Sequence, residues 1–397
     1  LTEEDLTFTY DARGRRASMT NANGGKLYYA YTQRGQLKQT AHLQVAPENS
    51  PATYHLEKYD YHPSGELKIF RSGEVVLNTP PTGSETLSNP IRGIDYTYNK
   101  RGLPTHIDYG QSLSINVTLT YDSWGRRTSM QDATGTSTWS FDPNKQLLTA
   151  FTSPAGTVQY EYNAAFDDLV KVKNLQAVGS EDIEYTYDLG GRLQTIKSPA
   201  GEITTLHYDA EGRLNKKQLP NGLDELYAYQ NNDWVTSVEI RNRATQAAVD
   251  LQTYSYFDTG LVHQHARGLS PNVVTTTYGY DELGQLLAET RSGVTTSYTY
   301  DGNGNRLTKQ VGSAAPEVYL YDLGDKLEQV SVNSTPVRTY GYDAEGRRIS
   351  KTAGGQTTTY AWNADNRLTG IDLPTGNDPA YTYNGAGARV GRTAGAT

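Results

Sequence analysis

A short motif repeats through almost the whole chain, and this repetition constrains the fold more than any other feature of the sequence. The motif is an aromatic residue, any residue, Tyr, Asp, two further residues, Gly, Arg and Leu, and its clearest copy spans Tyr185–Leu193. Successive copies are ~21 residues apart, with occasional insertions, so each copy is too short to form a core alone. The chain is therefore predicted to be an array of small units that stabilise one another.

The second aromatic residue of each copy marks its position in the array. About seventeen copies are found, with markers at Tyr10, Tyr31, Tyr61, Tyr98, Tyr121, Phe141, Tyr162, Tyr187, Tyr208, Tyr229, Tyr256, Tyr280, Tyr300, Tyr321, Tyr342, Trp362 and Tyr383. The next residue is Asp or Asn in most copies, which is typical of a turn because such side chains bond nearby backbone N–H groups. Gly, or else Asp or Asn, stands four residues after most markers, and these residue types tolerate positive φ.

Each copy is predicted to form one β-hairpin. The residues before the marker are rich in Thr, Tyr and Val, which favours a strand, and the Arg-Leu after the turn begins a second short strand. No helix-length apolar stripe occurs. The paired aromatic residues lie on the same face of a strand, so we expect the rings of adjacent hairpins to form a ladder.

The predicted fold is all-β, with tandem hairpins forming a spiralling antiparallel sheet that curls into an open hollow shell or barrel-like wall. Seventeen hairpins supply ~34 strands, and at ~4.8 Å per strand the strip would be ~160 Å long. An open sheet seldom exceeds ~10 strands without curling, so the strip is expected to wind around a cavity. We predict one array over residues 1–397, no separate effector or core domain, and exposed loops at the insertions Ala46–Pro51, Leu77–Pro90 and Arg241–Asp250.

Composition agrees with a thin sheet. The chain has 31 tyrosines and 6 phenylalanines, and tyrosine suits a surface that is neither dry nor fully wet. Cysteine is absent, which excludes disulfides and thiolate metal sites. The net charge of -8 and the scattered basic residues argue against nucleic acid as a partner. No apolar run is long enough for a transmembrane segment.

The recurring residues are interpreted as turn and ladder residues, because repetition favours architecture over chemistry. In the sharpest copies these structural positions are Tyr187, Asp188, Gly191, Arg192, Tyr208, Asp209, Gly212, Tyr280, Asp281, Gly284, Tyr300, Asp301, Gly304, Tyr342, Asp343 and Gly346.

Two further patterns resemble binding sites, and neither is complete. Asp301–Asn305 resembles the start of a calcium loop, but Arg306 stands at the position of the required Gly and no Glu follows at the twelfth position. His263 and His265 share one strand face, but no third metal ligand can be nominated. The sequence has no Gly-x-Ser-x-Gly motif, phosphate-binding Gly loop or Cys nucleophile. We therefore predict no catalytic, cofactor or metal residue.

The motif copies, such as Tyr280–Gly284, resemble those of the RHS/YD-repeat proteins, and the resemblance extends from Phe8 to about Arg392. This family includes bacterial polymorphic toxins, wall-associated proteins, the B and C components of Tc toxin complexes, and the teneurins. The resemblance implies a hollow β-shell, which in the toxins encloses a C-terminal effector and in teneurins supports adhesive domains. Asp142–Lys145 and Asp378–Ala380 do not match the DPxG-like segment of the toxin core, so no protease residue is carried over.

The resemblance implies that the chain is a shell segment of a secreted or surface-exposed bacterial protein. Its partner would be a C-terminal effector of the same polypeptide or another shell or plug domain. Leu1 in place of Met indicates a fragment, and no compositionally distinct tail precedes Thr397, so we expect wall and not cargo. The alternative is an adhesive or carbohydrate-binding cell-surface module with glycans as ligands. A third hypothesis, a glycan hydrolase, would require paired acidic side chains that converge in a cavity.

Overall fold

The computed structural model of the chain describes residues 6–45, 51–88, 90–110, 116–175 and 182–394. Within these residues all regular structure is β-strand, and 34 strands form one antiparallel sheet. The prediction of an all-β fold built from tandem hairpins is confirmed. Parts of two predicted loops, residues 46–50 and residue 89, lie outside the described residues.

Each copy of the motif forms one hairpin. Every marker residue is the last residue of an odd-numbered strand, from Tyr10 in the first strand to Tyr383 in the last hairpin. The pairing with the following strand shifts register at the marker, for example between Thr186 and Tyr187. Such a bulge bends the strand and increases its right-handed twist. Because the shift recurs at the same place in copy after copy, its effect on the sheet accumulates.

The chain divides into two compact units, which are described separately: unit 1 comprises residues 1–136 and 298–397, and unit 2 comprises residues 137–297. The strands of unit 1 are β1 (Thr7–Tyr10), β2 (Arg16–Thr20), β3 (Lys26–Tyr31), β4 (Leu37–Val45), β5 (Ala52–Tyr61), β6 (Leu67–Leu77), β7 (Arg92–Tyr98), β8 (Pro104–Asp108), β9 (Asn116–Tyr121), β10 (Arg127–Asp132), β26 (Arg306–Val311), β27 (Glu317–Tyr321), β28 (Leu327–Val332), β29 (Thr335–Tyr342), β30 (Arg348–Ala353), β31 (Gln356–Trp362), β32 (Leu368–Asp372), β33 (Ala380–Tyr383) and β34 (Arg389–Thr393).

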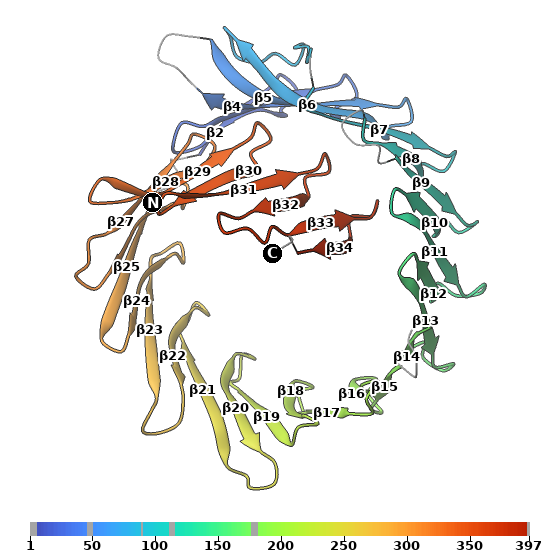
Figure 1. Cartoon of the computed structure of the whole chain (residues 1–397), viewed down its shortest axis with the longest axis vertical. Coiled ribbons are helices and arrows are strands. Elements are labelled where there is room, and N and C mark those ends of the chain that lie inside the picture. The colour runs from blue at the N-terminus through green and yellow to red at the C-terminus, as the bar shows by residue number, and fades with distance from the viewer. Residues whose placement is uncertain (1–5, 46–50, 89, 111–115, 176–181, 395–397) are drawn as a thin grey trace. The chain divides into compact units, whose positions relative to one another are not determined.

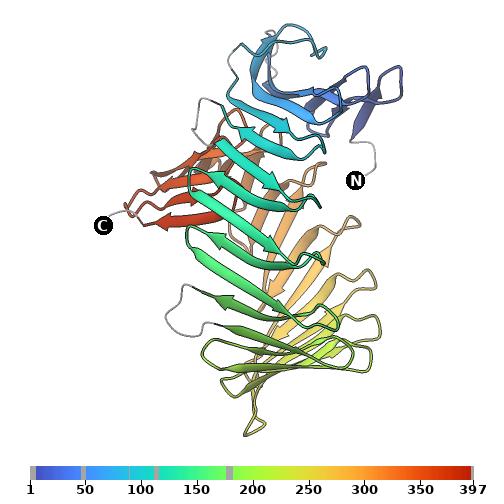
Figure 2. The ribbon, with the colours of Figure 1, turned by 90° about the vertical axis from the view of Figure 1, so that its right-hand side faces the viewer.

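The strands of unit 2 are β12 (Leu148–Ser153), β13 (Gly156–Tyr162), β14 (Leu169–Asn174), β15 (Ile183–Tyr187), β16 (Leu193–Lys197), β17 (Ile203–Tyr208), β18 (Leu214–Gln218), β19 (Leu223–Tyr229), β20 (Val235–Asn242), β21 (Ala248–Tyr256), β22 (Val262–Arg267), β23 (Val274–Tyr280) and β24 (Leu286–Arg291). Two strands, β11 (Gly135–Phe141) and β25 (Val294–Tyr300), cross the boundaries between the units. Figure 2 shows the strands of β12–β18 following one another side by side.

Unit 1 brings early and late hairpins of the array together. In Figure 1 the strands β28–β31 lie beside β2–β6. One cluster of buried residues in unit 1 consists of Ala41 and Leu43 from β4 and Tyr54 and Leu56 from β5, and Leu56 is fully buried. Leu323, in the turn between β27 and β28, packs against this cluster. A residue from a late hairpin therefore completes the core of the early ones.

Unit 2 is a single layer of strands that follow one another along an arc (Figure 1). Its buried side chains, among the described residues, are the polar groups of Ser137, Asp224, Thr276 and Thr296. The apolar side chains of unit 2 are half-buried or exposed. Strand pairing and contacts between neighbouring hairpins therefore stabilise unit 2, because none of its apolar side chains that the structure describes is buried.

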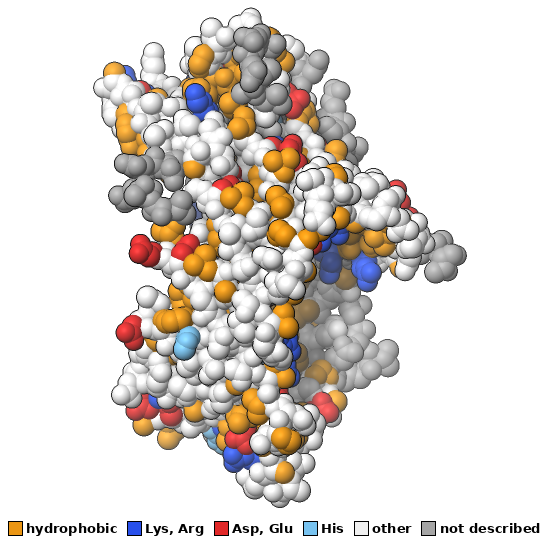
Figure 3. Space-filling model, turned by 90° about the vertical axis from the view of Figure 1, so that its left-hand side faces the viewer, with side chains coloured by type: hydrophobic (Ala, Val, Ile, Leu, Met, Phe, Trp, Pro, Cys, Tyr) orange, Lys and Arg blue, Asp and Glu red, His pale blue; other side chains and the backbone are white. Residues whose placement is uncertain are grey.

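The two faces of the unit 2 sheet differ in burial. In β21, Tyr254 and Tyr256 on one face are half-buried, whereas Thr253 and Ser255 on the other face are exposed. The view in Figure 3 shows a surface on which hydrophobic side chains are spread among uncharged polar ones and backbone, with charged side chains scattered between them. In β21 the tyrosine-bearing face is thus the more buried of the two faces.

The insertion at Arg241–Asp250 forms less of a loop than the sequence analysis predicts. Pairing of β20 with β21 continues out to Arg241 opposite Ala248, so half of the insertion lengthens the two strands. Arg243, in the turn, donates from Nε to the buried Asp224 at 2.7 Å. An ion pair with the neighbouring strand thus holds the turn against the sheet, which the sequence pattern did not indicate.

Candidate functional site

The Asp of the motif closes the turn of each hairpin. Asp188 Oδ1 accepts hydrogen bonds from the backbone N–H groups of Gly190 at 2.9 Å and Arg192 at 3.0 Å, and its Oδ2 accepts one from Arg192 Nε at 2.8 Å. The backbone and side chain of Arg192 lower the pKa of Asp188. Asp209 and Asp343 bind the arginine four residues later in the same way. The carboxylate is therefore occupied by its own turn.

Copies without the arginine keep the backbone part of this arrangement. Asp281 Oδ1 accepts from the N–H of Gln285 at 2.8 Å, and Asp301 Oδ1 accepts from the N–H of Asn305 at 2.8 Å. The turn therefore depends on the Asp and the backbone, and the side-chain ion pair is an addition in the copies that carry Arg.

The glycine of the motif has a positive φ in the predicted copies. The values are 76° at Gly191, 84° at Gly212, 78° at Gly284, 86° at Gly304 and 75° at Gly346. Asp and Asn residues take over the same position in other copies with φ close to 60°. The turn therefore imposes the left-handed conformation on whichever residue stands there.

The marker tyrosine joins its hairpin to the preceding one through its hydroxyl group. Tyr187 Oη donates to the backbone carbonyl of Leu169 at 2.8 Å, and Tyr208 Oη donates to that of Leu193 at 2.7 Å. Equivalent bonds are made by Tyr31, Tyr61, Tyr98, Tyr121, Tyr162, Tyr229, Tyr256, Tyr321, Tyr342 and Tyr383.

Sequence reasoning missed this hydroxyl bond, although the excess of tyrosine over phenylalanine is its signal. Phenylalanine would supply the same ring without the donor. Trp362, at the marker position of its copy, also has a polar hydrogen, and its Nε1 donates to the carbonyl of Arg348 at 2.9 Å. Tyr280 differs, since its ring meets Phe257 edge-on with centroids 6.1 Å apart.

The arginine of the motif reaches forward to the next hairpin. The guanidinium carbon of Arg192 lies 4.7 Å from the ring centre of Tyr208, and that of Arg213 lies 4.7 Å from Tyr229. Arg213 Nη1 also donates to the backbone carbonyl of Gln230 at 3.3 Å. The sequence analysis expected tyrosine rings of adjacent hairpins to contact one another. In these copies an arginine guanidinium group contacts the tyrosine ring of the next hairpin instead. Tyr, Asp and Arg thus connect each hairpin to both of its neighbours.

A second set of contacts, which we call the seam, joins early and late hairpins of unit 1. Its residues are Asn21, Ala22, Asn23, Gln44, His55, Ser72 and Arg92 on the early hairpins, and Asp301, Asn303, Asp325, Lys326 and Glu345 on the late ones. A further contact of the same kind is the bond from the Gly385 N–H to Asp132 Oδ2.

Glu345 places a buried carboxylate in the seam. It stands in the turn between β29 and β30, and its side chain is 4% exposed. Ser72 Oγ donates to its carboxylate, and His55 Nε2 and Arg92 Nη1 lie 3.9 Å and 4.0 Å from its two oxygens. A carboxylate from a late hairpin is thus surrounded by polar and basic groups of three early strands.

The segment Asp301–Asn305, which resembles the start of a calcium loop, belongs to the seam. Asp301 Oδ2 accepts hydrogen bonds from the Nδ2 atoms of Asn23 at 2.9 Å and Asn305 at 3.0 Å. Asp325 Oδ1 accepts one from Asn303 Nδ2 at 2.7 Å. Side-chain amides therefore occupy the carboxylates in this arrangement. The described residues contain no group of three or more His, Asp or Glu placed to hold a metal ion.

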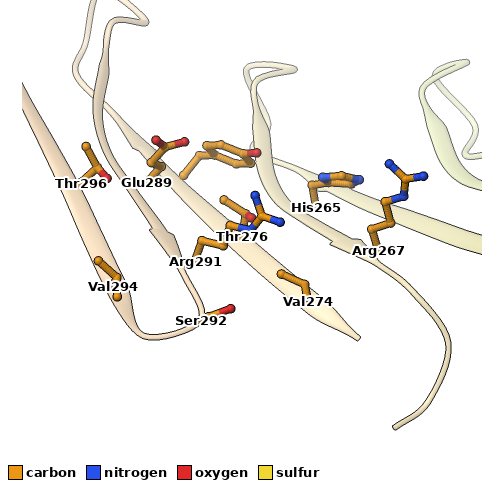
Figure 4. Close-up of a pocket in the computed structure, with 10 residues that line it drawn as sticks. His265, Arg267, Val274, Thr276, Glu289, Arg291, Ser292, Val294 and Thr296 are labelled. Carbon is orange, nitrogen blue, oxygen red and sulfur yellow. The ribbon is translucent and has the colours of Figure 1, made fainter. Parts of the chain in front are cut away.

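A groove with a volume of about 690 Å³ lies on the tyrosine-bearing face of unit 2, across β22–β25. Its walls include His265, Arg267, Thr276, Tyr278 and Arg291. Figure 4 shows the labelled side chains projecting from neighbouring strands into the same space. The register explains this arrangement, because His265 pairs with Thr276 and Thr276 pairs with Arg291, so these three residues form one row across the sheet.

The two histidines that share one strand face contact different aromatic rings. The His265 ring is stacked on Tyr254, with centroids 4.8 Å apart and an angle of 13° between the planes. The His263 ring packs against Phe257 at 4.7 Å. Both imidazoles therefore make ring contacts within the sheet.

Family comparisons agree with the repeat geometry. The Teneurin YD-shell family matches residues 82–207 and 165–331, which together cover well over half of the chain, and the RHS repeat family matches residues 342–378. The chain belongs to the YD-shell family. The resemblance inferred from the Tyr-Asp-x-x-Gly-Arg motif is thereby confirmed.

Relatives of this YD-shell chain are much longer proteins. The tRNA nuclease WapA of Bacillus subtilis (strain 168) is 24% identical over 285 residues, covering 63% of the chain and 11% of the relative. Double-stranded DNA deaminase toxin A of Burkholderia cenocepacia (strain H111) is 24% identical over 400 residues, covering 91% of the chain and 26% of the relative. The chain thus spans between about a tenth and about a quarter of the length of these relatives.

Solved structures of Tc toxin components are also similar to this YD-shell chain. TcdB2-TccC3 without the hypervariable C-terminal region matches with a TM-score of 0.41 and 14% sequence identity, over 98% of this chain and 28% of that chain.

Proposed function

We propose that this chain is a non-enzymatic wall segment of a longer RHS-type protein, and that the complete shell encloses a C-terminal effector of the same polypeptide. The parent protein would be secreted or exposed at the cell surface. In this role the repeats exclude proteases from the enclosed segment and hold it until it is delivered.

One observation carries the proposal: the recurring polar groups of the motif are used to hold neighbouring hairpins. The Tyr hydroxyl, the Asp carboxylate and the Arg guanidinium of the Tyr187–Arg192 copy all have partners within the sheet. A repeat whose polar groups serve its own assembly suits a wall better than an active site. The single-layer construction of unit 2 and the toxin names of the relatives support the same role. In the described residues no helix is long and apolar enough to cross a membrane.

Limited proteolysis of the full-length parent protein tests enclosure. The segment downstream of the repeats is expected to resist protease in the intact protein and to be degraded when the repeats are deleted. Equal protease sensitivity with and without the repeats would disprove enclosure.

A matched pair of variants sharpens this test. The double variant Tyr187→Phe, Tyr208→Phe removes two hydroxyl hydrogen bonds between neighbouring hairpins and is expected to speed cleavage of the downstream segment. The control Tyr185→Phe is expected to leave the rate of cleavage unchanged. Nuclease or deaminase activity in residues 1–397 alone would refute the non-enzymatic role.

A further inference from the structure

We propose that the groove of unit 2 binds an acidic polypeptide segment in an extended conformation. The inference stands on two guanidinium groups in the groove, on their availability and on their separation. It does not depend on the enclosure of an effector, because the groove could take an acidic segment supplied by a separate molecule.

Arg291 supplies the first guanidinium group. Its side chain is exposed at the end of β24, and it has no ion pair or hydrogen bond with any residue that the structure describes. A guanidinium group presents a planar fork of N–H donors that matches a carboxylate. An arginine that lines a groove without a partner of its own is therefore a ready site for a carboxylate from outside.

Arg267 supplies the second group, and only part of it is occupied. Its Nε and Nη2 atoms each lie 3.1 Å from Asp250 Oδ2, while the side chain is 63% exposed. Its Nη1 atom has no partner within the described ranges. A second carboxylate can therefore bind to Arg267 while the ion pair with Asp250 stays in place.

The register fixes the separation of the two arginines. Arg267 pairs with Val274, and Arg291 pairs with Thr276, so the two lie two strands apart and offset by two residues along the strands. With ~4.8 Å between strands and ~3.4 Å per residue, their Cα atoms are ~12 Å apart. In an extended peptide, residues i and i+4 point to the same side and are ~13 Å apart. Acidic residues at these positions would reach both arginines.

The remaining walls of the groove define which parts of the ligand carry charge. Thr276 and Thr296 place hydroxyl groups on its floor, and the Tyr278 ring offers an apolar surface. Glu289 lines the same groove and would repel a carboxylate next to it. The acidic residues of the ligand are therefore expected at the end formed by the two arginines, with uncharged residues over Tyr278 and Glu289.

Fluorescence anisotropy with labelled peptides tests the proposal. The probe is a nine-residue peptide of Thr and Ser with Glu at two positions four residues apart, and its comparison peptide has Gln at both positions. The intact chain is expected to bind the Glu peptide at least tenfold more tightly than the Gln peptide, with affinity that falls as salt rises.

Three variants separate this site from general attraction. Arg291→Gln and Arg267→Gln are each expected to weaken binding of the Glu peptide about tenfold, since each loses a charge-assisted hydrogen bond. Lys26→Gln removes one exposed positive charge from a strand of unit 1 and is expected to leave binding unchanged. Circular dichroism checks that each variant keeps the β-sheet spectrum of the parent chain.

Several outcomes would overturn the proposal. These are equal binding of the Glu and Gln peptides, undiminished binding by Arg291→Gln, or an equal loss of binding in Lys26→Gln. Displacement of the peptide by inorganic phosphate at the peptide's own concentration would also overturn it, because the groove would then be a site for small anions. Any of these outcomes would refute peptide binding by the groove without bearing on enclosure, which the protease test measures separately.

Discussion

The contact between β14 and β15, which joins two neighbouring hairpins and is called the joint below, offers the sharpest test of how one hairpin holds the next. These two strands pair through Lys171 with Glu184 and through Val172 with Ile183, which is a short ladder. The Tyr187 hydroxyl adds a bond across the same joint, to the Leu169 carbonyl at 2.8 Å. Replacing Tyr187 by Phe removes this bond and leaves the ring.

The expected loss of stability follows from the hydrogen bond that this hydroxyl makes. An internal hydrogen bond contributes about 0.5–1.5 kcal/mol to stability. A change of about 1 kcal/mol corresponds to about a fivefold increase in the opening equilibrium of the joint. Tyr185, on the same strand and the same face, has no hydrogen-bond partner for its hydroxyl in the described part of the chain. Tyr185→Phe is therefore expected to change the free energy of opening by less than about 0.5 kcal/mol.

Native-state hydrogen exchange measures this opening hairpin by hairpin. In a repeat array each unit contacts its neighbours, so the effect of one substitution remains local. Amides of β14 and β15 are expected to exchange about fivefold faster in Tyr187→Phe, and amides of β30 and β31 are expected to be unchanged. If Tyr185→Phe accelerates exchange as much as Tyr187→Phe does, the ring and not the hydroxyl carries the joint, and the reasoning is refuted.

Three other predictions concern unit 1. Glu345→Ala leaves buried hydrogen-bond donors of the seam without their carboxylate. It is expected to lower the free energy of unfolding, measured in urea titrations, by about 2–4 kcal/mol. The control Glu328→Ala, at an exposed strand position, is expected to change this free energy little. Burial raises the pKa of Tyr109 and of Tyr319 to about 12, so stability is present below pH 10 and is lost as the pH rises towards 12; an unchanged urea midpoint between pH 9 and pH 11.5 would contradict this. Burial and the charge of Lys326 lower the pKa of His42 below 6.5, so stability is expected to fall as the pH drops below that value, and His42→Gln removes this part of the pH dependence of the urea midpoint.

The repeated part of this protein could be predicted from sequence because its causes are local. A marker at the strand end, an Asp that bonds the next N–H groups and a residue with positive φ all act within about six residues. The marker positions therefore coincide with the ends of all odd-numbered strands, from Tyr10 to Tyr383. The excess of tyrosine over phenylalanine also indicates the hydroxyl bond, but the sequence analysis interpreted this excess only as a preference for partly solvated surfaces.

The seam and the groove were decided by tertiary structure. Glu345 stands at the third position after its marker, where Trp124 and Glu211 stand in other copies, and nothing in its own hairpin distinguishes it as a buried residue. It is buried because Ser72 and Arg92, from hairpins formed much earlier in the chain, lie against that turn. Local propensity determines which residues turn and which extend, whereas the pairing of distant hairpins depends on the accumulated twist and register of every strand between them.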